Sequence, residues 1–294
     1  MPSVKARLVG KGRKHKDRDF DAPVFRPPPI SLPPPGKTEA LDGRIRNLEA
    51  LDPGFTTGAV LASYMAIPGL VGFWPMSSVQ RSTGNVYDLS GQSRTLTYNG
   101  NPSFTYFNGL VPYIDLDGTG DYLSRADETD LDILGSENIY TVGGSQGLTL
   151  GGWFWLDDTS GSPSFLGKHD NATPAGSAYL IYLAGGSVHF IVYNGTSSYE
   201  AVNTLDPTTG AWYFIAGRYT TSTEVAVFVG NNKVIFTTSI PASLNNVAAA
   251  FQIGARAGGN LINGRAALCF LSANTLSDDL INSLYQTSRI LFNV

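Results

Sequence analysis

The feature that most constrains this sequence is a two-residue alternation of apolar and polar side chains, repeated in short segments from Leu70 onward. Successive side chains of a β-strand point to opposite faces of a sheet, so this period predicts strands. The predicted strands are 70–76, 95–100, 113–118, 121–125, 148–156, 164–169, 178–183, 188–193, 212–219, 225–230, 233–239, 251–256 and 266–271. Tight links at Gly185-Gly186 and at Gly230-Asn231-Asn232 predict hairpins. The pattern therefore predicts an all-β fold, an antiparallel two-sheet sandwich.

A C-terminal helix is expected after the last strand. Ser277 can cap it, acidic residues follow in its first turn, and apolar residues recur at helical spacing. The expected buried face consists of Leu280, Ile281, Leu284 and Tyr285. The single cysteine, Cys269, excludes an intrachain disulfide, and its apolar surroundings predict a buried thiol.

Charge and proline content divide the chain near residue 52. Residues 1–52 hold 11 Lys/Arg against 7 Asp/Glu, and residues 53–294 hold 9 against 17, so the balances of +4 and −8 sum to −4. Eight of the 17 prolines lie in the first 35 residues, where two PPP triplets favour extended backbone. We expect an extended anchoring arm over 1–38, a short helix and connector over 39–68, and one domain over 69–294.

The basic arm is expected to dock on other proteins rather than on nucleic acid, because the acidic body shows no nucleic-acid-binding motif. The residues expected to anchor it are Lys5, Arg7, Arg13, Lys14 and Arg26. The short helix carries a four-three apolar spacing and resembles the R-h-x-x-h-E pattern of three-stranded coiled coils, where h is apolar. The residues expected to join a homotrimer are Leu41, Arg44, Ile45, Leu48 and Glu49, and an ordinary surface helix is the alternative.

Several pieces of the body, in order over about 215 residues, resemble the laminin G-like branch of the concanavalin A-like lectin/glucanase superfamily. They include GLVGFWPMSS at 69–78, IDLDGTGDYLS at 114–124, LTLGGWFWLDD at 148–158 and TGAWYFIAGRYTTSTEVAVFVGNNKV at 209–234. The resemblance implies a jelly-roll sandwich, and members of this superfamily bind glycans, bind proteins or serve as rigid modules.

The resemblance also raises two kinds of site. Glucanase members carry E-x-D-x-x-E on a strand, but the nearest text here, Glu128 to Ile133, lacks the second glutamate and lies in an acidic, turn-like segment. We therefore expect no catalytic residues. Laminin G-like relatives often hold calcium, for which Asp117 and Asp121 are candidate ligands. A plain turn between strands is the favoured alternative, so no cofactor is expected.

Glycan binding needs aromatic faces for sugar C–H groups, with amides and carboxylates for the hydroxyls. The candidates near predicted loops are Tyr193, Asn194, Tyr199, Trp212 and Asn231. For Trp212 in particular, a place in the core is the competing interpretation.

An arm, a trimerising helix and a lectin-like head together resemble viral, especially bacteriophage, attachment and decoration proteins. We expect a non-enzymatic protein of the virion surface, on capsid or tail, made in the host cytoplasm and bound to other virion proteins through residues 1–54. Its head would contact a host surface glycan or stabilise the shell. No apolar run reaches the ~18–20 residues of a membrane span, so no membrane partner is expected. A free carbohydrate-binding adhesin and, less favoured, a glucanase-like hydrolase remain open.

Overall fold

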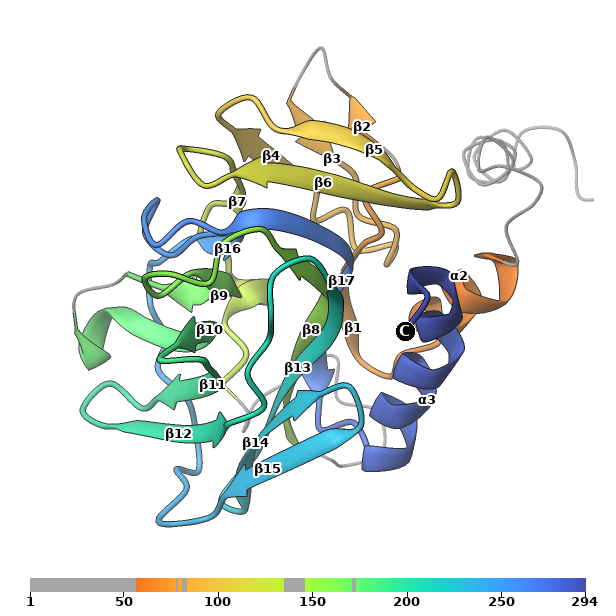
Figure 1. Ribbon diagram of the computed structural model, residues 1–294. Helices are drawn as coiled ribbons and strands as arrows, with labels where there is room; N and C mark the ends of the chain where they lie inside the picture. The colour runs from red at the N-terminus through yellow and green to blue at the C-terminus, as the bar shows by residue number, and fades with distance from the viewer. Residues whose placement is uncertain (1–56, 78, 81–83, 135–145, 171–172) are drawn as a thin grey trace, which may run out of the picture. The chain divides into compact units, whose positions relative to one another are not determined.

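The computed structural model describes residues 57–77, 79–80, 84–134, 146–170 and 173–294, all within the unit Arg46–Val294. These residues form two antiparallel β-sheets, the helices α2 (Thr57–Met65) and α3 (Asp278–Arg289), and three short 3-10 turns (Figure 1). The 3-10 turns are η1 (Thr129–Leu131), η2 (Pro174–Gly176) and η3 (Ile290–Phe292). The anchoring arm and the trimerising residues predicted from the sequence lie outside the described residues.

Sheet A has the strand order β15-β14-β13-β8-β17-β6-β5, and β1 also pairs with β17. Its strands are β1 (Leu70–Trp74), β5 (Ser103–Phe107), β6 (Val111–Asp117), β8 (Gln146–Leu156), β13 (Trp212–Thr220), β14 (Glu224–Val229), β15 (Asn232–Phe236) and β17 (Asn263–Asn274). A bulge in β17 at Leu268, whose φ is +47°, shifts the register against β8. Because of this bend, the first half of β17 pairs with β6 and the second half with β1.

Sheet B has the order β12-β11-β10-β9-β16-β7-β4-β3-β2. Its strands are β2 (Val79–Gln80), β3 (Asn85–Val86), β4 (Leu96–Asn99), β7 (Tyr122–Arg125), β9 (Ser164–His169), β10 (Ser177–Ala184), β11 (Ser187–Tyr193), β12 (Ser198–Asn203) and β16 (Phe251–Ile253). Each of the thirteen predicted segments overlaps one of the observed strands, so the predicted two-sheet sandwich is confirmed. The predicted hairpins are confirmed too: Gly185 and Gly186, both with positive φ, join β10 to β11.

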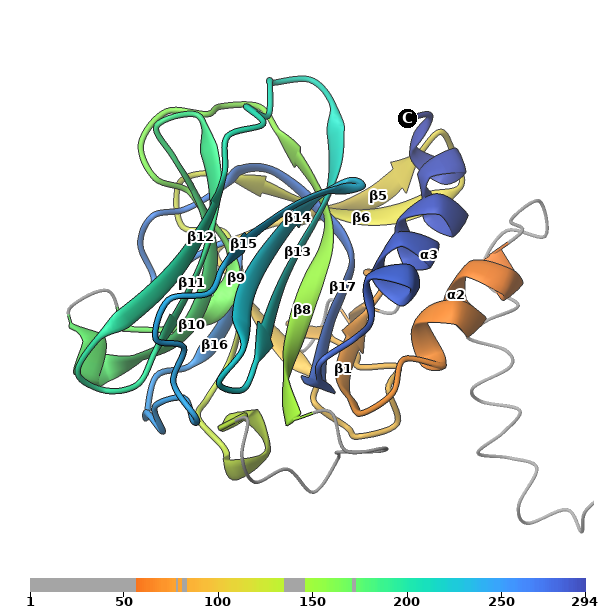
Figure 2. The same cartoon turned by 90° about the horizontal axis from the view of Figure 1, so that it is seen from below.

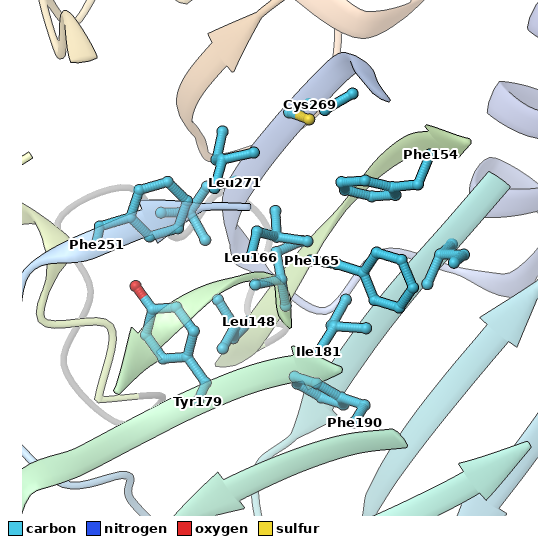
Figure 3. Packing of buried hydrophobic residues seen from close by; sticks show 14 of the residues in the cluster. Leu148, Phe154, Phe165, Leu166, Tyr179, Ile181, Phe190, Phe251, Cys269 and Leu271 are labelled. Atoms are coloured by element: carbon cyan, nitrogen blue, oxygen red, sulfur yellow. The ribbon is translucent and has the colours of Figure 1, made fainter. Parts of the chain in front are cut away.

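The main core lies between the two sheets, and both contribute large apolar side chains to it (Figure 3). Phe154 of β8 meets Phe165 of β9 with ring centroids 4.9 Å apart. Cys269 is buried among these residues as predicted, and burial raises the pKa of its thiol. Gly217 faces Phe190, and a Cβ at this position would lie 2.5 Å from the Phe190 ring. The two sheets therefore approach closely where β13 lacks a side chain.

A second apolar layer covers the outer face of sheet A. Figure 2 shows α2 and α3 on the side of sheet A that faces away from sheet B. Trp153 of β8 stacks on Phe292 of η3 at 4.2 Å, and Ser277 caps α3 by accepting a hydrogen bond from the Leu280 amide, as predicted. The part of the expected connector that the structure describes, from residue 57, contains α2, and α2 packs on this layer. None of the helices in the described ranges is long and apolar enough to cross a membrane.

Candidate functional site

The outer face of sheet B carries the candidate site, because none of the described helices covers it (Figure 2). Along β10, Tyr179 and Ile181 point into the core, so the alternation turns Leu180 and Tyr182 to the outside. The neighbouring strands and the loop after β16 add mainly polar and aromatic side chains to this face. We name these residues the outer-face cluster: His169, Tyr182, His189, Tyr193, Glu200 and Arg256.

At one end of the cluster, Tyr182 and His189 share a carboxylate. They are register partners on β10 and β11, and their rings stack with centroids 4.7 Å apart. The Tyr182 hydroxyl donates to Glu200 Oε1 at 2.6 Å, and His189 Nδ1 lies 3.0 Å from the same oxygen. Burial alone would raise the pKa of Glu200, but the hydrogen bonds from His189 and Tyr182 outweigh it and lower the pKa. Glu200 is therefore a carboxylate fixed by two donors on an open face.

At the other end, His169 and Tyr193 form a neutral pair. His169 Nε2 lies 3.0 Å from the Tyr193 hydroxyl, and the rings meet edge to face. Burial, and then the positive charge of Arg256, lower the pKa of His169 to about 4. Burial raises the pKa of Tyr193 to about 12. Both rings are uncharged near neutral pH, and both are largely buried, with 7% of His169 and 9% of Tyr193 exposed.

Arg256 lies over the ring of Tyr182, with its Cζ 5.4 Å from the ring centroid. A mutual pair of backbone hydrogen bonds between Arg256 and Gly259 shapes its loop. The Nε atom is buried without a hydrogen-bond partner, and no carboxylate of the described residues lies within ion-pair distance of the guanidinium. The other arginines among the described residues each donate to a protein oxygen: Arg94, Arg125, Arg218, Arg265 and Arg289. Arg256 is thus an unpaired cation, held by stacking alone.

Of the five glycan-binding residues predicted from the sequence, Tyr193 lies in this cluster. Asn194 and Tyr199 lie beside each other at the β11–β12 turn, where Asn194 Nδ2 donates to the Tyr199 hydroxyl at 3.1 Å. Asn194 Oδ1 accepts from the turn amides, and the Tyr199 ring packs on the inter-sheet core. These two side chains are therefore used to hold the turn. Trp212 is 3% exposed within the layer under η3, so its ring presents no open face.

Asn231 lies far from that cluster in sequence and structure, on the β14–β15 turn beside α3. It borders a cavity of about 340 Å³. The cavity is lined by Phe228, Gly230, Asn231, Lys233, Asp278, Asp279, Asn282 and Gln286. Its cation, Lys233, is already paired with Asp278 at 3.0 Å, and its aromatic ring lies under Arg218 and Lys233. The cavity therefore offers hydrogen-bonding groups but no open aromatic face.

His169, Tyr182, His189, Glu200 and Arg256 were not predicted as site residues. The proximity of Tyr182 and His189 could have been predicted from the Gly185-Gly186 hairpin, because a two-residue turn places these two residues opposite each other. Arg256 had no such signal, since it comes from a separate loop whose approach to β10 depends on the whole sheet order.

The family profile described as the concanavalin A-like lectin/glucanases superfamily matches residues 117–269, which are 153 of the 294 residues. The chain belongs to this superfamily. The match covers most of sheet B, including every residue of the outer-face cluster. No protein of the curated set matches the chain.

Solved structures share the fold of this superfamily member at low sequence identity. The receptor-binding domain of botulinum neurotoxin C/D mosaic serotype matches with a TM-score of 0.54 and 11% identity over 74% of this chain and 51% of that chain. The ligand-binding domain of botulinum neurotoxin serotype D, solved with N-acetylneuraminic acid, matches with a TM-score of 0.57 and 11% identity. The match covers 78% of this chain and 52% of that chain. The binding domain of Paraclostridial Mosquitocidal Protein 1 matches with a TM-score of 0.54 and 10% identity, over 74% of this chain and 52% of that chain. The chain spans about half the length of each of these structures, and the likeness concerns the fold.

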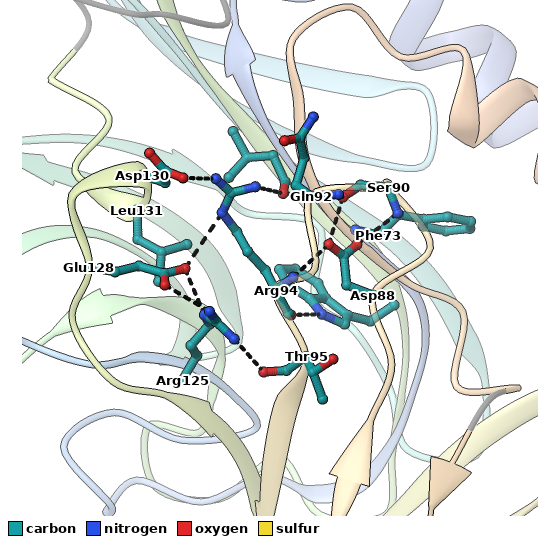
Figure 4. A network of polar contacts seen from close by, with 12 residues as sticks. Phe73, Asp88, Ser90, Gln92, Arg94, Thr95, Arg125, Glu128, Asp130 and Leu131 are labelled. Carbon is teal, nitrogen blue, oxygen red and sulfur yellow. Dashed lines mark hydrogen bonds and ion pairs between the residues drawn. The ribbon is translucent and has the colours of Figure 1, made fainter. Parts of the chain in front are cut away.

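The acidic segment compared with the glucanase motif has a structural explanation in this lectin-like domain (Figure 4). Glu128 begins the turn η1 instead of lying on a strand, and it accepts two hydrogen bonds from Arg125. Arg94 is buried, binds Asp130, and donates to the carbonyl of Val71 at 2.9 Å. The carboxylates are thus neutralised by Arg125 on β7 of sheet B and by Arg94, which also binds the backbone of β1 in sheet A.

The two aspartates considered for calcium lie at separate backbone amides. Asp117 Oδ1 accepts from the Thr119 amide at 2.7 Å, and Asp121 Oδ1 accepts from the Asn101 amide at 2.7 Å. Within the ranges that the structure describes, no group of three or more His, Cys, Asp or Glu side chains could hold a metal ion. Each aspartate thus holds local backbone, as in the turn of the alternative interpretation, and the absence of a cofactor stays a prediction.

Proposed function

We propose that residues 69–294 are a non-enzymatic, lectin-like head that binds host-surface glycans through the outer-face cluster. The observation that supports this is the unusual content of an open sheet face: two tyrosines, two histidines, a fixed carboxylate and an unpaired arginine lie together. Partial burial of charged groups costs free energy, and a solvent-facing sheet does not need them in order to fold. Clusters of this kind are typical of binding sites.

Each part of the cluster has a role in this proposal. Tyr182 and Tyr193 would contact the sugar through their ring edges, because Tyr182 already stacks on His189 and lies under Arg256, and Tyr193 is largely buried. Glu200 accepts hydrogen bonds from hydroxyls with the lone pairs that His189 and Tyr182 leave free. Gln252, the register partner of Gly167 at the centre of sheet B, uses its Oε1 on the Gly258 amide and keeps its NH₂ group for a ligand.

The experiment is a glycan array probed with the full-length protein, followed by calorimetry on the best glycan. Tyr182→Ala and Glu200→Gln should each weaken binding at least about tenfold, the loss that one charged hydrogen bond or aromatic contact brings. Tyr106→Ala is the matched control, because Tyr106 is an exposed tyrosine of sheet A. The proposal is wrong if no glycan binds, or if Asn231→Ala abolishes binding while the cluster variants do not.

We further propose that residues 1–54 anchor this head, as a homotrimer, to other proteins of a virion surface. The support is the sequence itself, in which a basic, proline-rich segment of charge +4 precedes an acidic body of charge −8. Deleting residues 1–36 should abolish incorporation into particles while leaving glycan binding intact. Replacing Ile45 and Leu48 by Asp should convert a trimer to a monomer by mass photometry. If particle incorporation survives the deletion, the protein fits the alternative of a free carbohydrate-binding adhesin.

A further inference from the structure

The unpaired state of Arg256 points to the chemistry of the ligand. Within the part of the chain that the structure describes, this guanidinium has no protein acceptor, whereas every other arginine and lysine there has a protein oxygen as partner. The surrounding body carries an excess of eight acidic residues, so partners were abundant. Because Arg256 has no acidic partner among the described residues, its positive charge is available to a group from outside the chain.

The position of Arg256 is nevertheless well defined. Its guanidinium stacks on Tyr182, and its loop is tied to sheet B where Gly258 donates to Gln252 and where Ser164 donates to the Asn260 carbonyl. Stacking on a ring leaves the in-plane N–H donors of a guanidinium directed sideways, away from the ring. These contacts fix the plane of the guanidinium but satisfy none of its donors.

A second polar group without a partner lies at the same place. Ser164 is the register partner of Tyr182, and its Oγ is buried with no hydrogen bond. Buried polar side-chain atoms without a partner are rare in native proteins, and two of them, Arg256 Nε and Ser164 Oγ, occur on the strands and loop that border one ring. Ser164 is fully buried, so of these two residues only the half-buried Arg256 can reach an oxyanion from outside the chain.

We infer that the outer-face cluster binds a carboxylated saccharide, with Arg256 holding the carboxylate and Tyr182 and Gln252 holding the ring that bears it. A guanidinium presents two parallel N–H groups that match a carboxylate, and such pairs are among the strongest hydrogen bonds in proteins. Glu200 does not cancel this site, since its charge is committed to His189 and to the Tyr182 hydroxyl. The inference rests on the proposed glycan-binding function and specifies its ligand.

The test uses one glycan array printed twice, once untreated and once with all its carboxylates converted to neutral amides. Full-length protein should bind carboxylated glycans at least about tenfold more strongly than their amides, and sulfated neutral-sugar glycans only weakly. Arg256→Gln should remove this preference while keeping the weak affinity for the amides. Arg256→Lys should keep part of the preference, because it retains the charge but not the forked geometry.

Arg265→Gln is the matched control. Arg265 also stacks on aromatic rings, at 4.8 Å from Trp155, but it has a carboxylate partner in Asp115 and lies on sheet A. This change should leave the preference untouched. Equal binding to both printings, an unchanged preference in folded Arg256→Gln, or a preference for sulfate over carboxylate would overturn the inference while glycan binding stands. Absence of binding to either printing would instead overturn the proposed function itself.

Discussion

Replacing the buried Lys168 by methionine should lower the free energy of unfolding, because Lys168 pairs with two carboxylates. The side chain lies on β9, points toward the core side of sheet B, and is fully buried. Its ammonium group contacts Asp127 at 2.6 Å and also Asp132, which is 9% exposed. These pairs connect the segment around η1 to β9. In Lys168→Met the apolar stem is kept, so the change removes the charge with little change in packing.

The expected loss of stability comes from the carboxylates that Lys168→Met leaves without a cation. Removing one partner of a buried ion pair destabilises a protein by about 3–5 kcal/mol, because the remaining charge is desolvated without compensation. With a urea m-value of about 3 kcal/mol/M for a chain of this size, the unfolding midpoint should fall by about 1–1.7 M. Tryptophan fluorescence in urea measures this directly, since Trp74 and Trp153 are buried. Adding Asp132→Asn to Lys168→Met should recover part of the loss, because it neutralises the more buried of the two stranded carboxylates.

Lys233→Met is the control for the reasoning. Lys233 also bridges two carboxylates, Asp278 and Glu224, but its side chain is 25% exposed. An exposed pair of this kind contributes about 0–1 kcal/mol. If Lys168→Met and Lys233→Met shift the urea midpoint equally, burial does not set the cost. If Asp132→Asn fails to recover stability in the double variant, the stranded carboxylate is not its source.

Three further outcomes follow from the structure. The pKa of His169 is about 4 in the folded chain against 6.5 unfolded, so the unfolded state binds the extra proton and stability falls as pH drops from 6.5 toward 4. In His169→Gln this loss, at most about 3 kcal/mol, should be missing from urea titrations at pH 7, 5.5 and 4.5; an unchanged slope would contradict it. Gly217→Ala places a methyl group against Phe190 and should cost about 1–3 kcal/mol, whereas a thermal midpoint equal to wild type would show that the sheets can part without penalty. Ser277→Ala removes the acceptor for the Leu280 amide and should cost about 1 kcal/mol of thermal stability, restored by Ser277→Asp.

Strands were predictable where a short apolar run ends at a glycine turn. In β10 and β14 nearly every residue is buried, and a glycine follows the last residue of each strand. The four strands missed by the alternation have other patterns. β5 and β12 lie at the edges of their sheets and are largely polar or half-exposed, so no apolar stripe reveals them.

The helix α2 was missed for a different reason. Its sequence, TGAVLASYM, is small and apolar on most sides, so it lacks the polar stripe that separates a surface helix from a connector. Its buried residues Val60, Leu61 and Tyr64 pack on the outer layer of sheet A. Only the presence of that layer makes a helix the favoured state of this segment.

The candidate site was predicted only in part, because alternation says which residues leave the core but not what covers them. Trp212 and Tyr193 are both aromatic residues near strand ends, and the sequence treats them alike. The structure separates them by sheet: Trp212 lies beneath η3, and Tyr193 lies on the uncovered face of sheet B. Sheet order, which depends on pairing between distant strands, decides between these outcomes.

The composition of the two outer faces explains this difference. Sheet A turns Trp153, Phe214 and Phe270 outward, and exposing three large apolar side chains would cost several kcal/mol, so α2 and α3 must cover them. Sheet B turns Tyr182, Glu200 and other groups with hydrogen-bonding edges outward, which water can solvate without a covering helix. One face is therefore covered by helices of the chain itself, while the other keeps polar and aromatic groups, Arg256 among them, without a covering helix. This difference in composition is the reason for placing the proposed glycan site on sheet B, since the outer face of sheet A is occupied by α2 and α3.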